Sequence, residues 1–364
     1  MISFKLTEEQ EMVRDAMREF AGQAMRPLAR ETDESSKLPE DFLAQSWELG
    51  LVSTQLPEAY GGGGEPRSLV TNAIVLEELA WGDATLALAA LAPSLFAYAV
   101  ADQGSEEQKQ KYLPLFCDTS YHAATLALVE PAPLFDPALP RTLAEPKGSD
   151  FVLSGTKSFV PMGDRASHFL VTARNNGARD AFIVPRDAEG LSISEPEKNL
   201  GLKALPTVTL ELERVQVAAA DRLGGDAGCD VQRLENRSRA GLAAVMVGLS
   251  RAVLEYAVPY AKEREAFDQA IAQKQAIAFK LADMHIETDA SRWLAWKAAS
   301  QLDQGLDATR AAHIARSYAA EKSMWIADNG VQVLGGHDFI REHPVEMWFR
   351  NARTLGVLEG TVCI

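Results

Sequence analysis

The sequence predicts a multidomain α+β protein with an N-terminal helical domain, a middle antiparallel β-sandwich or barrel domain and a C-terminal four-helix-bundle domain. Three observations lead to this prediction. The first is the length of 364 residues, which exceeds the size of a domain built around a single hydrophobic core. Apolar residues recur at spacings of three and four up to about Phe116 and again after about Asp226. Between these positions the chain changes to short alternating runs separated by turn residues. We therefore expect domains at residues 1–119, 120–225 and 226–364.

The N-terminal domain is predicted to be helical, with helices in residues 7–34, 39–51 and 67–92. Thr7, followed three residues later by Gln10, is a capping-box arrangement that starts the first helix. The segment PEAYGGGGEP (residues 57–66) is expected to be a flexible turn or loop. Its glycines neither follow a strand nor precede a Lys-Ser/Thr pair, so a phosphate-binding loop is not predicted.

The middle domain is predicted from five strand-like segments, residues 151–160, 168–174, 181–186, 191–196 and 207–217. No long helical period interrupts them, which favours a sandwich or barrel over a doubly wound sheet. The Pro-rich stretch ALVEPAPLFDPALPRTLAEP (residues 127–146) is expected to be mostly loop.

The C-terminal domain is predicted from three long helical segments, residues 239–265, 274–302 and 307–336. Their apolar stripes are wide enough for the core of a bundle. The third segment ends at Gly335 and Gly336, residues that are typical of a helix stop.

Composition excludes several classes of protein. The formal net charge of −15 argues against nucleic-acid or anionic-membrane binding. The three cysteines are too far apart for a disulfide framework or a CxxC pair, which fits a reducing, cytoplasmic location. The N-terminal residues have the pattern of an amphipathic helix rather than a signal peptide. The most apolar stretch, residues 84–100, is short for a membrane span and is interrupted by Pro93, so we expect a buried helix.

The sequence also lacks the common catalytic motifs. The six histidines include no HExxH, and no His/Cys/carboxylate cluster has the spacing of metal ligands, so no metal site is expected. There is no GxSxG nucleophile elbow and no GxGxxG after a strand.

Three stretches are unusual enough to be site candidates. Glu359 lies between apolar residues and a Gly-Thr pair, as either a solvated turn residue or an acid tuned for proton transfer. Arg264, Phe267 and Gln275 place a cation, an aromatic ring and an amide near a gap between helices. They suit a ligand with a phosphate and a ring, although an ordinary charged helix end has the same pattern. Gln332, followed by glycines that let backbone approach a ligand, is equally explained as a helix end before a turn.

Ordered segments across nearly the whole chain resemble the acyl-CoA dehydrogenase family. They are KLTEEQEMVRDAMREFA, PEAYGGGG, EEQKQKYLPLF, FVLSGTKSFV, LGLKALPTVTLELERVQV, AKEREAF, QKQAIAFKLADM, QVLGGHDFIREHPVEMWFRNAR and LEGT. The resemblance implies the family's three-domain fold and FAD bound in a cleft that a second subunit completes, in a homodimer or homotetramer. It also implies the family reaction, in which an acyl-CoA thioester loses an α-proton to a base and a β-hydride to flavin. The electrons then pass to an electron-transfer flavoprotein or another acceptor.

The resemblance assigns the chemistry to the segment around Glu359, which lies where the family has its catalytic base. The apolar sequence around this acid is expected to raise its basicity once water is expelled. Its backbone N–H belongs to the family's oxyanion hole for the thioester enolate. Leu358 and Gly360 lie beside the substrate, Gly360 permits close backbone approach, and Thr361 resembles a residue that touches the flavin.

The remaining resemblances concern FAD and the substrate. Residues that match the strand and the ring along the isoalloxazine are Leu126, Leu128, Val129 and Phe159. Three residues match those that reach the pyrophosphate and adenosine half of FAD from the neighbouring subunit: Arg264, Phe267 and Gln275. Three others match the segment that meets the adenine side: Gln332, Gly335 and Gly336. Arg239 matches an arginine at the start of the helix nearest the substrate.

The chain departs from the family at the reactive end of the site. The family segment TEPGAGSD is VEPAPLFD here, so Val129 replaces a threonine that bonds the flavin edge. Leu134 and Phe135 replace a Gly-Ser pair near the thioester, and we expect them to narrow or reroute the passage. A second flavin-contacting hydroxyl is replaced by Pro161.

These departures leave two further interpretations beside an active acyl-CoA dehydrogenase. One is a catalytically weakened paralogue that acts as the structural partner subunit of a hetero-oligomeric acyl-CoA dehydrogenase. The other is an offshoot that oxidises other substrates or lets dioxygen reoxidise the flavin. The presence of Glu359 favours the active enzyme, since a subunit freed from catalysis has no need of the base.

Overall fold

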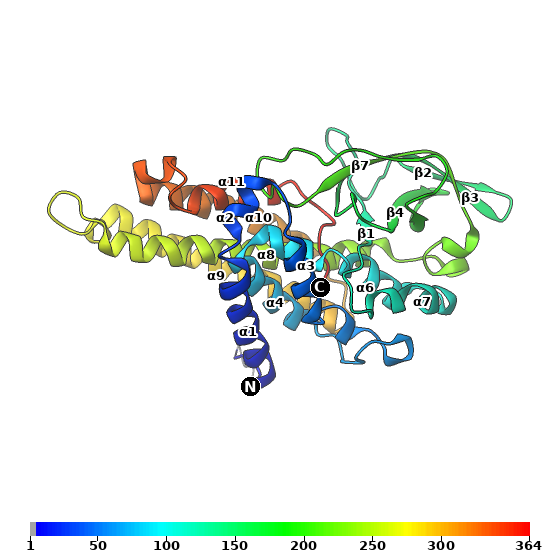
Figure 1. Cartoon of the computed structure of the whole chain (residues 1–364), viewed down its shortest axis with the longest axis horizontal. Coiled ribbons are helices and arrows are strands. Elements are labelled where there is room, and N and C mark those ends of the chain that lie inside the picture. The colour runs from blue at the N-terminus through cyan, green and yellow to red at the C-terminus, as the bar shows by residue number, and fades with distance from the viewer. Residues whose placement is uncertain (1–4) are drawn as a thin grey trace.

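The computed structural model describes residues 5–364 and contains helices, then strands, then helices (Figure 1). The predicted first domain begins at residue 1, and residues 1–4 lie outside the described part. In Figure 1 the strands gather at one end of the molecule, and the long C-terminal helices extend away from them. This architecture confirms the predicted fold class.

The N-terminal region consists of helices α1 (Glu8–Phe20), α2 (Ala29–Ser35), α3 (Glu40–Glu48), α4 (Leu69–Gly82), α5 (Ala84–Leu91), α6 (Ser94–Gln103) and α7 (Glu106–Tyr112). The predicted capping box is confirmed, because the Gln10 N–H donates to Thr7 Oγ1 and the Thr7 N–H donates to Gln10 Oε1. Asp83 separates α4 from α5 and caps α5 through the Leu86 N–H.

The most apolar helices are buried inside the protein, as the sequence predicts. Two stretches, Ala84–Gln103 and Val231–Glu263, have the length and hydropathy of a membrane span, and most of each is buried within the fold.

The glycine-rich segment differs from the flexible loop that we expected. After a 3₁₀ turn at Glu58–Tyr60, the backbone N–H groups of residues 61–65 all donate to carbonyls of residues 53–58. A Cβ atom at Gly62 would lie 2.2 Å from the Leu56 carbonyl oxygen. The glycines therefore allow two backbone segments to pack closely, and the resulting hydrogen bonds order the loop.

The middle region is one sheet of strands β1 (Thr125–Ala127), β2 (Leu143–Lys147), β3 (Asp150–Pro161), β4 (His168–Asn175), β5 (Ala178–Pro185), β6 (Leu191–Ile193) and β7 (Thr207–Val217). The strand order is β1-β4-β2-β3-β7-β6, with β5 also paired to β4. The pairings β1–β4 and β2–β4 are parallel, and the others in the described chain are antiparallel. The expectation of an antiparallel sheet is therefore wrong for these two, because β5 occupies one edge of β4 and the chain passes along the other edge twice in the same direction, as β1 and then, after a long loop, as β2.

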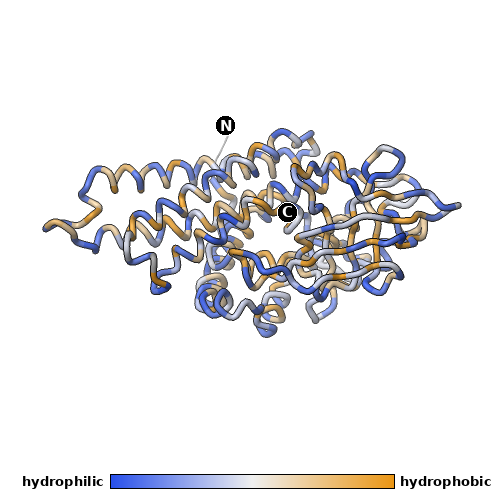
Figure 2. The backbone as a smooth tube through the Cα atoms, turned by 90° about the horizontal axis from the view of Figure 1, so that it is seen from above, coloured by the Kyte–Doolittle hydropathy of each residue, from blue (hydrophilic) through white to orange (hydrophobic). Residues whose placement is uncertain are grey.

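The C-terminal region contains α8 (Val231–Glu263), α9 (Gln275–Asp303), α10 (Thr309–Leu334) and α11 (Val345–Leu355). Helix α8 packs against α9 and α10 and also against α4 of the N-terminal region. Hydrophobic and hydrophilic residues alternate along the long helices (Figure 2), as expected for a bundle with one solvated face. The predicted stop of α10 is confirmed, since Gly335 follows it with a φ of +61°.

Candidate active site

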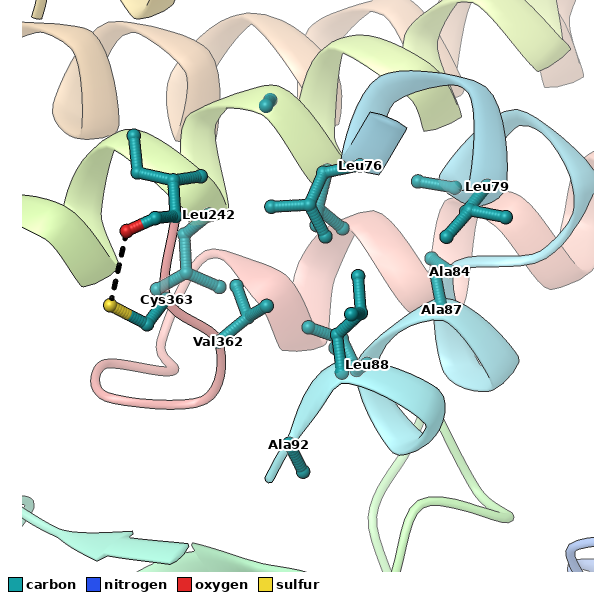
Figure 3. Packing of buried hydrophobic residues seen from close by; sticks show 14 of the residues in the cluster. Leu76, Leu79, Ala84, Ala87, Leu88, Ala92, Leu242, Val362 and Cys363 are labelled. Atoms are coloured by element: carbon teal, nitrogen blue, oxygen red, sulfur yellow. Dashed lines mark hydrogen bonds between the residues drawn. The ribbon is translucent and has the colours of Figure 1, made fainter. Parts of the chain in front are cut away.

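The segment after α11 carries Glu359 between two buried anchors. Leu358 is buried on one side of it, and Val362, Cys363 and Ile364 are buried on the other. Figure 3 shows Val362 and Cys363 among Leu76 of α4, Leu88 of α5 and Leu242 of α8. The Ser94 hydroxyl also donates to the Cys363 carbonyl at 3.1 Å. The hydrophobic core therefore anchors the chain on both sides of Glu359.

Gly360 brings this segment against strand β1 and the residues that follow it. Its φ is +67°, a conformation that favours glycine, and a Cβ atom there would lie 3.0 Å from Leu128 Cβ and 3.5 Å from Leu126 Cδ2. The structure thus brings together the predicted residues Leu126, Leu128 and Gly360. Thr361, the next residue, is fully buried, and its hydroxyl has no hydrogen-bond partner in the described chain.

The Glu359 side chain lies between two guanidinium groups. Arg316 Nε is 3.2 Å from Glu359 Oε1, and Arg239 Nε is 3.6 Å from Glu359 Oε2. The carboxylate-bearing side chain keeps 22% of its surface exposed. The expected apolar environment is therefore wrong: the neighbours in sequence are apolar, but α8 and α10 bring cations to the carboxylate. Arg239, which we expected beside the substrate, contacts the predicted base.

Arg316 is a site residue that the sequence analysis missed. It lies on the face of α10 that also carries Ala312, Ala315 and Ala319, all of which are buried. A guanidinium on a stripe of small buried residues is unusual, since buried charges need partners. That departure from the helical pattern was the signal that could have identified it. Burial lowers the pKa of Arg316, and the carboxylate of Glu359 opposes this shift.

A cleft of about 740 Å³ opens beside the carboxylate. Its walls include four of the predicted site residues, which are Val129, Phe135, Phe159 and Glu359. They also include residues that we did not predict, among them Glu130, Ser158, Glu197, Thr209, Arg316 and Val357. The chain therefore brings the proposed base, the loop after β1 and the end of β3 to one cavity.

The two bulky residues of the VEPAPLFD segment have different positions. Phe135 lines the cleft, but Leu134 is fully exposed, with a φ of +56°. The expectation that both narrow the passage is therefore wrong for Leu134, because the loop turns its side chain toward solvent. Pro161 is buried at the end of β3 opposite Thr207 and is absent from the cleft wall.

A buried ion pair holds the wall of the cleft. Lys157 Nζ donates to Glu130 Oε1 at 2.9 Å, to the Leu128 carbonyl at 3.2 Å and to Thr172 Oγ1 at 3.2 Å. Glu130 also accepts from the backbone N–H groups of Arg141 and Thr142, which closes the Pro-rich loop. Burial lowers the pKa of Lys157 to about 8, although Glu130 counteracts it.

The residues predicted to contact the adenosine half of FAD lie at another end of the bundle. Arg264 follows α8, Gln275 opens α9, and Gln332 lies near the end of α10, before Gly335 and Gly336. The Tyr260 hydroxyl joins these ends by donating to the Leu334 carbonyl at 3.3 Å.

Phe267 lies in the loop between α8 and α9. It has a φ of +55°, and its side chain is 88% exposed. In Figure 1 this loop is the tip of the molecule far from the strands. A single chain therefore does not bring Phe267 to the cleft.

Among residues 5–364, no group of three or more His, Cys, Asp and Glu side chains is arranged to hold a metal ion.

Three domain models of acyl-CoA dehydrogenases match the chain: the N-terminal domain at residues 7–120, the middle domain at residues 125–215 and the C-terminal domain at residues 230–364. A probable acyl-CoA dehydrogenase of Bacillus subtilis, YngJ, is 35% identical over 99% of this chain and 96% of its own. The butyryl-CoA dehydrogenase of Megasphaera elsdenii has a TM-score of 0.89 at 28% identity, over 99% of this chain and 96% of that one. A glutaryl-CoA dehydrogenase of Mycobacterium smegmatis in complex with FADH2 has a TM-score of 0.87 at 26% identity, over 98% and 92%.

Proposed function

Since the chain belongs to the acyl-CoA dehydrogenase family of flavin-dependent oxidoreductases, we propose that it desaturates an acyl-CoA thioester between its α and β carbons, with FAD as cofactor. One observation carries the proposal. Glu359, at the family's base position, faces a cleft whose other walls include the loop after β1 and the end of β3. A carboxylate held at the wall of a cavity can take a proton from a bound substrate.

The residues around the cleft fit a flavin. The hydroxyls of Ser158 and Thr361 are buried and have no partner in the described chain, so they are available to a polar ring system. Val129, Phe159 and Thr361, with the backbone of Leu126 and Leu128, would hold its isoalloxazine end. Bound FAD supplies the acceptor for the hydride that leaves the β carbon.

The backbone beside Glu359 suits stabilisation of an enolate. Within residues 5–364, the N–H groups of Leu358, Glu359 and Gly360 donate no hydrogen bond to protein. The N–H of Glu359 is therefore free to donate to a thioester oxygen as negative charge develops there. Glu359 takes the α-proton of a substrate bound in the cleft that Phe135 also lines.

A second copy of the chain supports the other half of the cofactor site. The α9 residues Phe279, Ile286 and Trp293, spaced by seven, are 61%, 61% and 44% exposed. An exposed apolar stripe of this kind is typical of a subunit interface. In a homodimer or homotetramer, Arg264, Phe267 and Gln275 would reach FAD of the neighbouring subunit, and Gln332, Gly335 and Gly336 would meet its adenine side.

An electron-transfer flavoprotein or another acceptor would then reoxidise the flavin, in the cytoplasm. The comparisons do not favour the alternative of a structural partner subunit without its own activity. The retained cleft and Glu359 argue in the same direction.

The visible spectrum of the purified protein tests cofactor binding, and its bleaching by acyl-CoA thioesters without oxygen tests the reaction. Glu359→Gln retains the shape of the side chain but cannot accept the proton. Flavin reduction should fall by ~10²–10⁴-fold while the substrate still binds. Unimpaired reduction in this variant would exclude Glu359 as the base. A wild-type flavoprotein that no acyl-CoA reduces would favour the structural-partner alternative.

A further inference from the structure

We propose that Arg316 is the positioning residue of the site, which fastens the carboxylate of Glu359 and the backbone before it to helix α10 as one unit. The inference rests on the proposed function, in which Glu359 takes a proton from the substrate. It concerns the placement of the base and assigns Arg316 no chemical step of its own.

The contacts of Arg316 are divided between backbone and carboxylate. One terminal nitrogen, Nη2, donates to the carbonyls of Gly356 at 3.0 Å and Leu358 at 2.7 Å, and more distantly to Leu355 at 3.4 Å. Its Nε lies 3.2 Å from Glu359 Oε1. The guanidinium thus holds the end of α11 through hydrogen bonds and the acid that follows it through an ion pair.

The segment depends on this contact more than on any other hydrogen bond. Gly356 and Val357 donate back into α11. From Leu358 to Thr361, the bond from Arg316 to the Leu358 carbonyl is the one hydrogen bond that the described chain supplies to the backbone. The burial of Leu358 and Val362 limits where this segment can move, but apolar contacts do not orient a carboxylate.

Arg239 provides a comparison, because it carries the same charge near the same carboxylate without the backbone contacts. It lies 3.6 Å from Glu359 and 4.0 Å from Glu235, which in turn pairs with Arg179 at 2.6 Å. Removal of Arg239 therefore removes a cation from the base and leaves the 355–358 segment attached to α10. The two arginines separate the effect of charge from the effect of position.

Position matters because a proton is transferred over a short distance. A misplacement of about 1 Å can cost ~10²-fold in rate. Without Arg316 the carboxylate can adopt other rotamers, and the backbone that carries it is free to shift toward the cleft. Substrate affinity depends on the whole length of the acyl-CoA and should change little.

Anaerobic flavin reduction tests this in Arg316→Met, Arg316→Lys and Arg239→Met, with Arg310→Met as control at an exposed position early in the same helix. We expect Arg316→Met to lower the limiting rate of reduction by ~10–100-fold, with the substrate dissociation constant within about twofold of wild type. Arg316→Lys should recover part of the rate, because an ammonium group can reach one carbonyl or the carboxylate but not both. Arg310→Met should behave as wild type.

A second readout isolates the base. Deuterium uptake from D2O into 3,3-dimethylbutyryl-CoA, which has no β-hydrogen, reports removal of the α-proton alone. We expect uptake to fall in Arg316→Met as reduction does, and less in Arg239→Met. Equal losses in the two variants would mean that charge rather than position is at work and would overturn the proposal, as would a wild-type limiting rate in Arg316→Met.

Should Arg316→Met lose its flavin, Arg316→Lys decides alone: an unchanged limiting rate overturns the proposal, and a reduced rate with retained flavin and affinity supports it. A wild-type protein that shows neither uptake nor reduction would refute the proposed function instead.

Discussion

Replacing Lys157 by methionine tests the ion pair that holds the wall of the cleft. Methionine has a similar length and fills the same buried space, so the change removes charge and hydrogen bonds with little change in packing. The substitution removes the ammonium group together with its hydrogen bonds to Glu130, the Leu128 carbonyl and Thr172. Glu130 keeps the N–H groups of Arg141 and Thr142 but becomes a buried carboxylate without a cation.

The magnitude follows from the burial of both partners. The side chain of Lys157 is 0% exposed and that of Glu130 is 3% exposed, so water does not compensate the remaining charge. Breaking such a pair typically costs about 3–5 kcal/mol of unfolding free energy. The substitution should also weaken flavin binding, because Val129 precedes Glu130, Phe159 follows Lys157 by two residues, and both Val129 and Phe159 line the cleft.

Thermal unfolding followed by circular dichroism, together with release of flavin fluorescence, measures both effects. Flavin should be released at a clearly lower temperature in Lys157→Met than in wild type. Lys147→Met, at an exposed lysine of β2, is the control and should behave as wild type. The double variant Lys157→Met/Glu130→Gln should regain part of the loss, because it leaves no unpaired charge. Unchanged unfolding and flavin retention in the single variant would refute the reasoning.

The same pair predicts a dependence on pH. The pKa of Lys157 is lowered by burial to about 8, whereas the ordinary value is 10.5. Between these values the unfolded chain binds more protons at this lysine than the folded chain does, so wild-type stability rises with pH relative to Lys157→Met. Between pH 8 and 10.5 the unfolding free energy of the wild type should therefore rise, relative to that of Lys157→Met, by on the order of 3 kcal/mol, since each pKa unit corresponds to about 1.36 kcal/mol. A difference that stays constant from pH 8 to 10.5 would contradict the assignment.

Two further variants test the site. Phe135→Ser opens the cleft, so across a series of acyl-CoA thioesters kcat/KM should rise, or bulkier acyl groups should be accepted. Leu139→Ser, at an exposed position in the same loop, should leave kcat/KM and the range of acyl groups unchanged. Unaltered kcat/KM values for Phe135→Ser would show that this ring does not limit the passage. Arg264→Ala should lower both the flavin content per subunit and the stability of the dimer on gel filtration, whereas Lys262→Ala, at an exposed position two residues earlier, should not. Arg264 is exposed at the end of α8, so wild-type flavin content in Arg264→Ala would count against a cofactor contact from the second subunit.

The division between what could and could not be predicted is clearest around Glu359. Its place in LEGT identified it as the candidate base, and its apolar neighbours in sequence suggested an apolar environment. The structure instead surrounds the carboxylate with Arg239 and Arg316. Likewise, Leu134 and Phe135 are adjacent bulky residues in sequence, yet one faces solvent and the other faces the cleft.

By itself the sequence determined the order of helical, strand and helical regions, the first capping box and the end of α10. These features depend on side-chain periodicity and on interactions within a few residues, which a linear pattern records. Only the tertiary structure decided the electrostatic partners of Glu359, the pair between Lys157 and Glu130 and the order in the glycine-rich loop. Each depends on segments distant in sequence meeting at hydrogen-bonding distance, and packing alone brings them together.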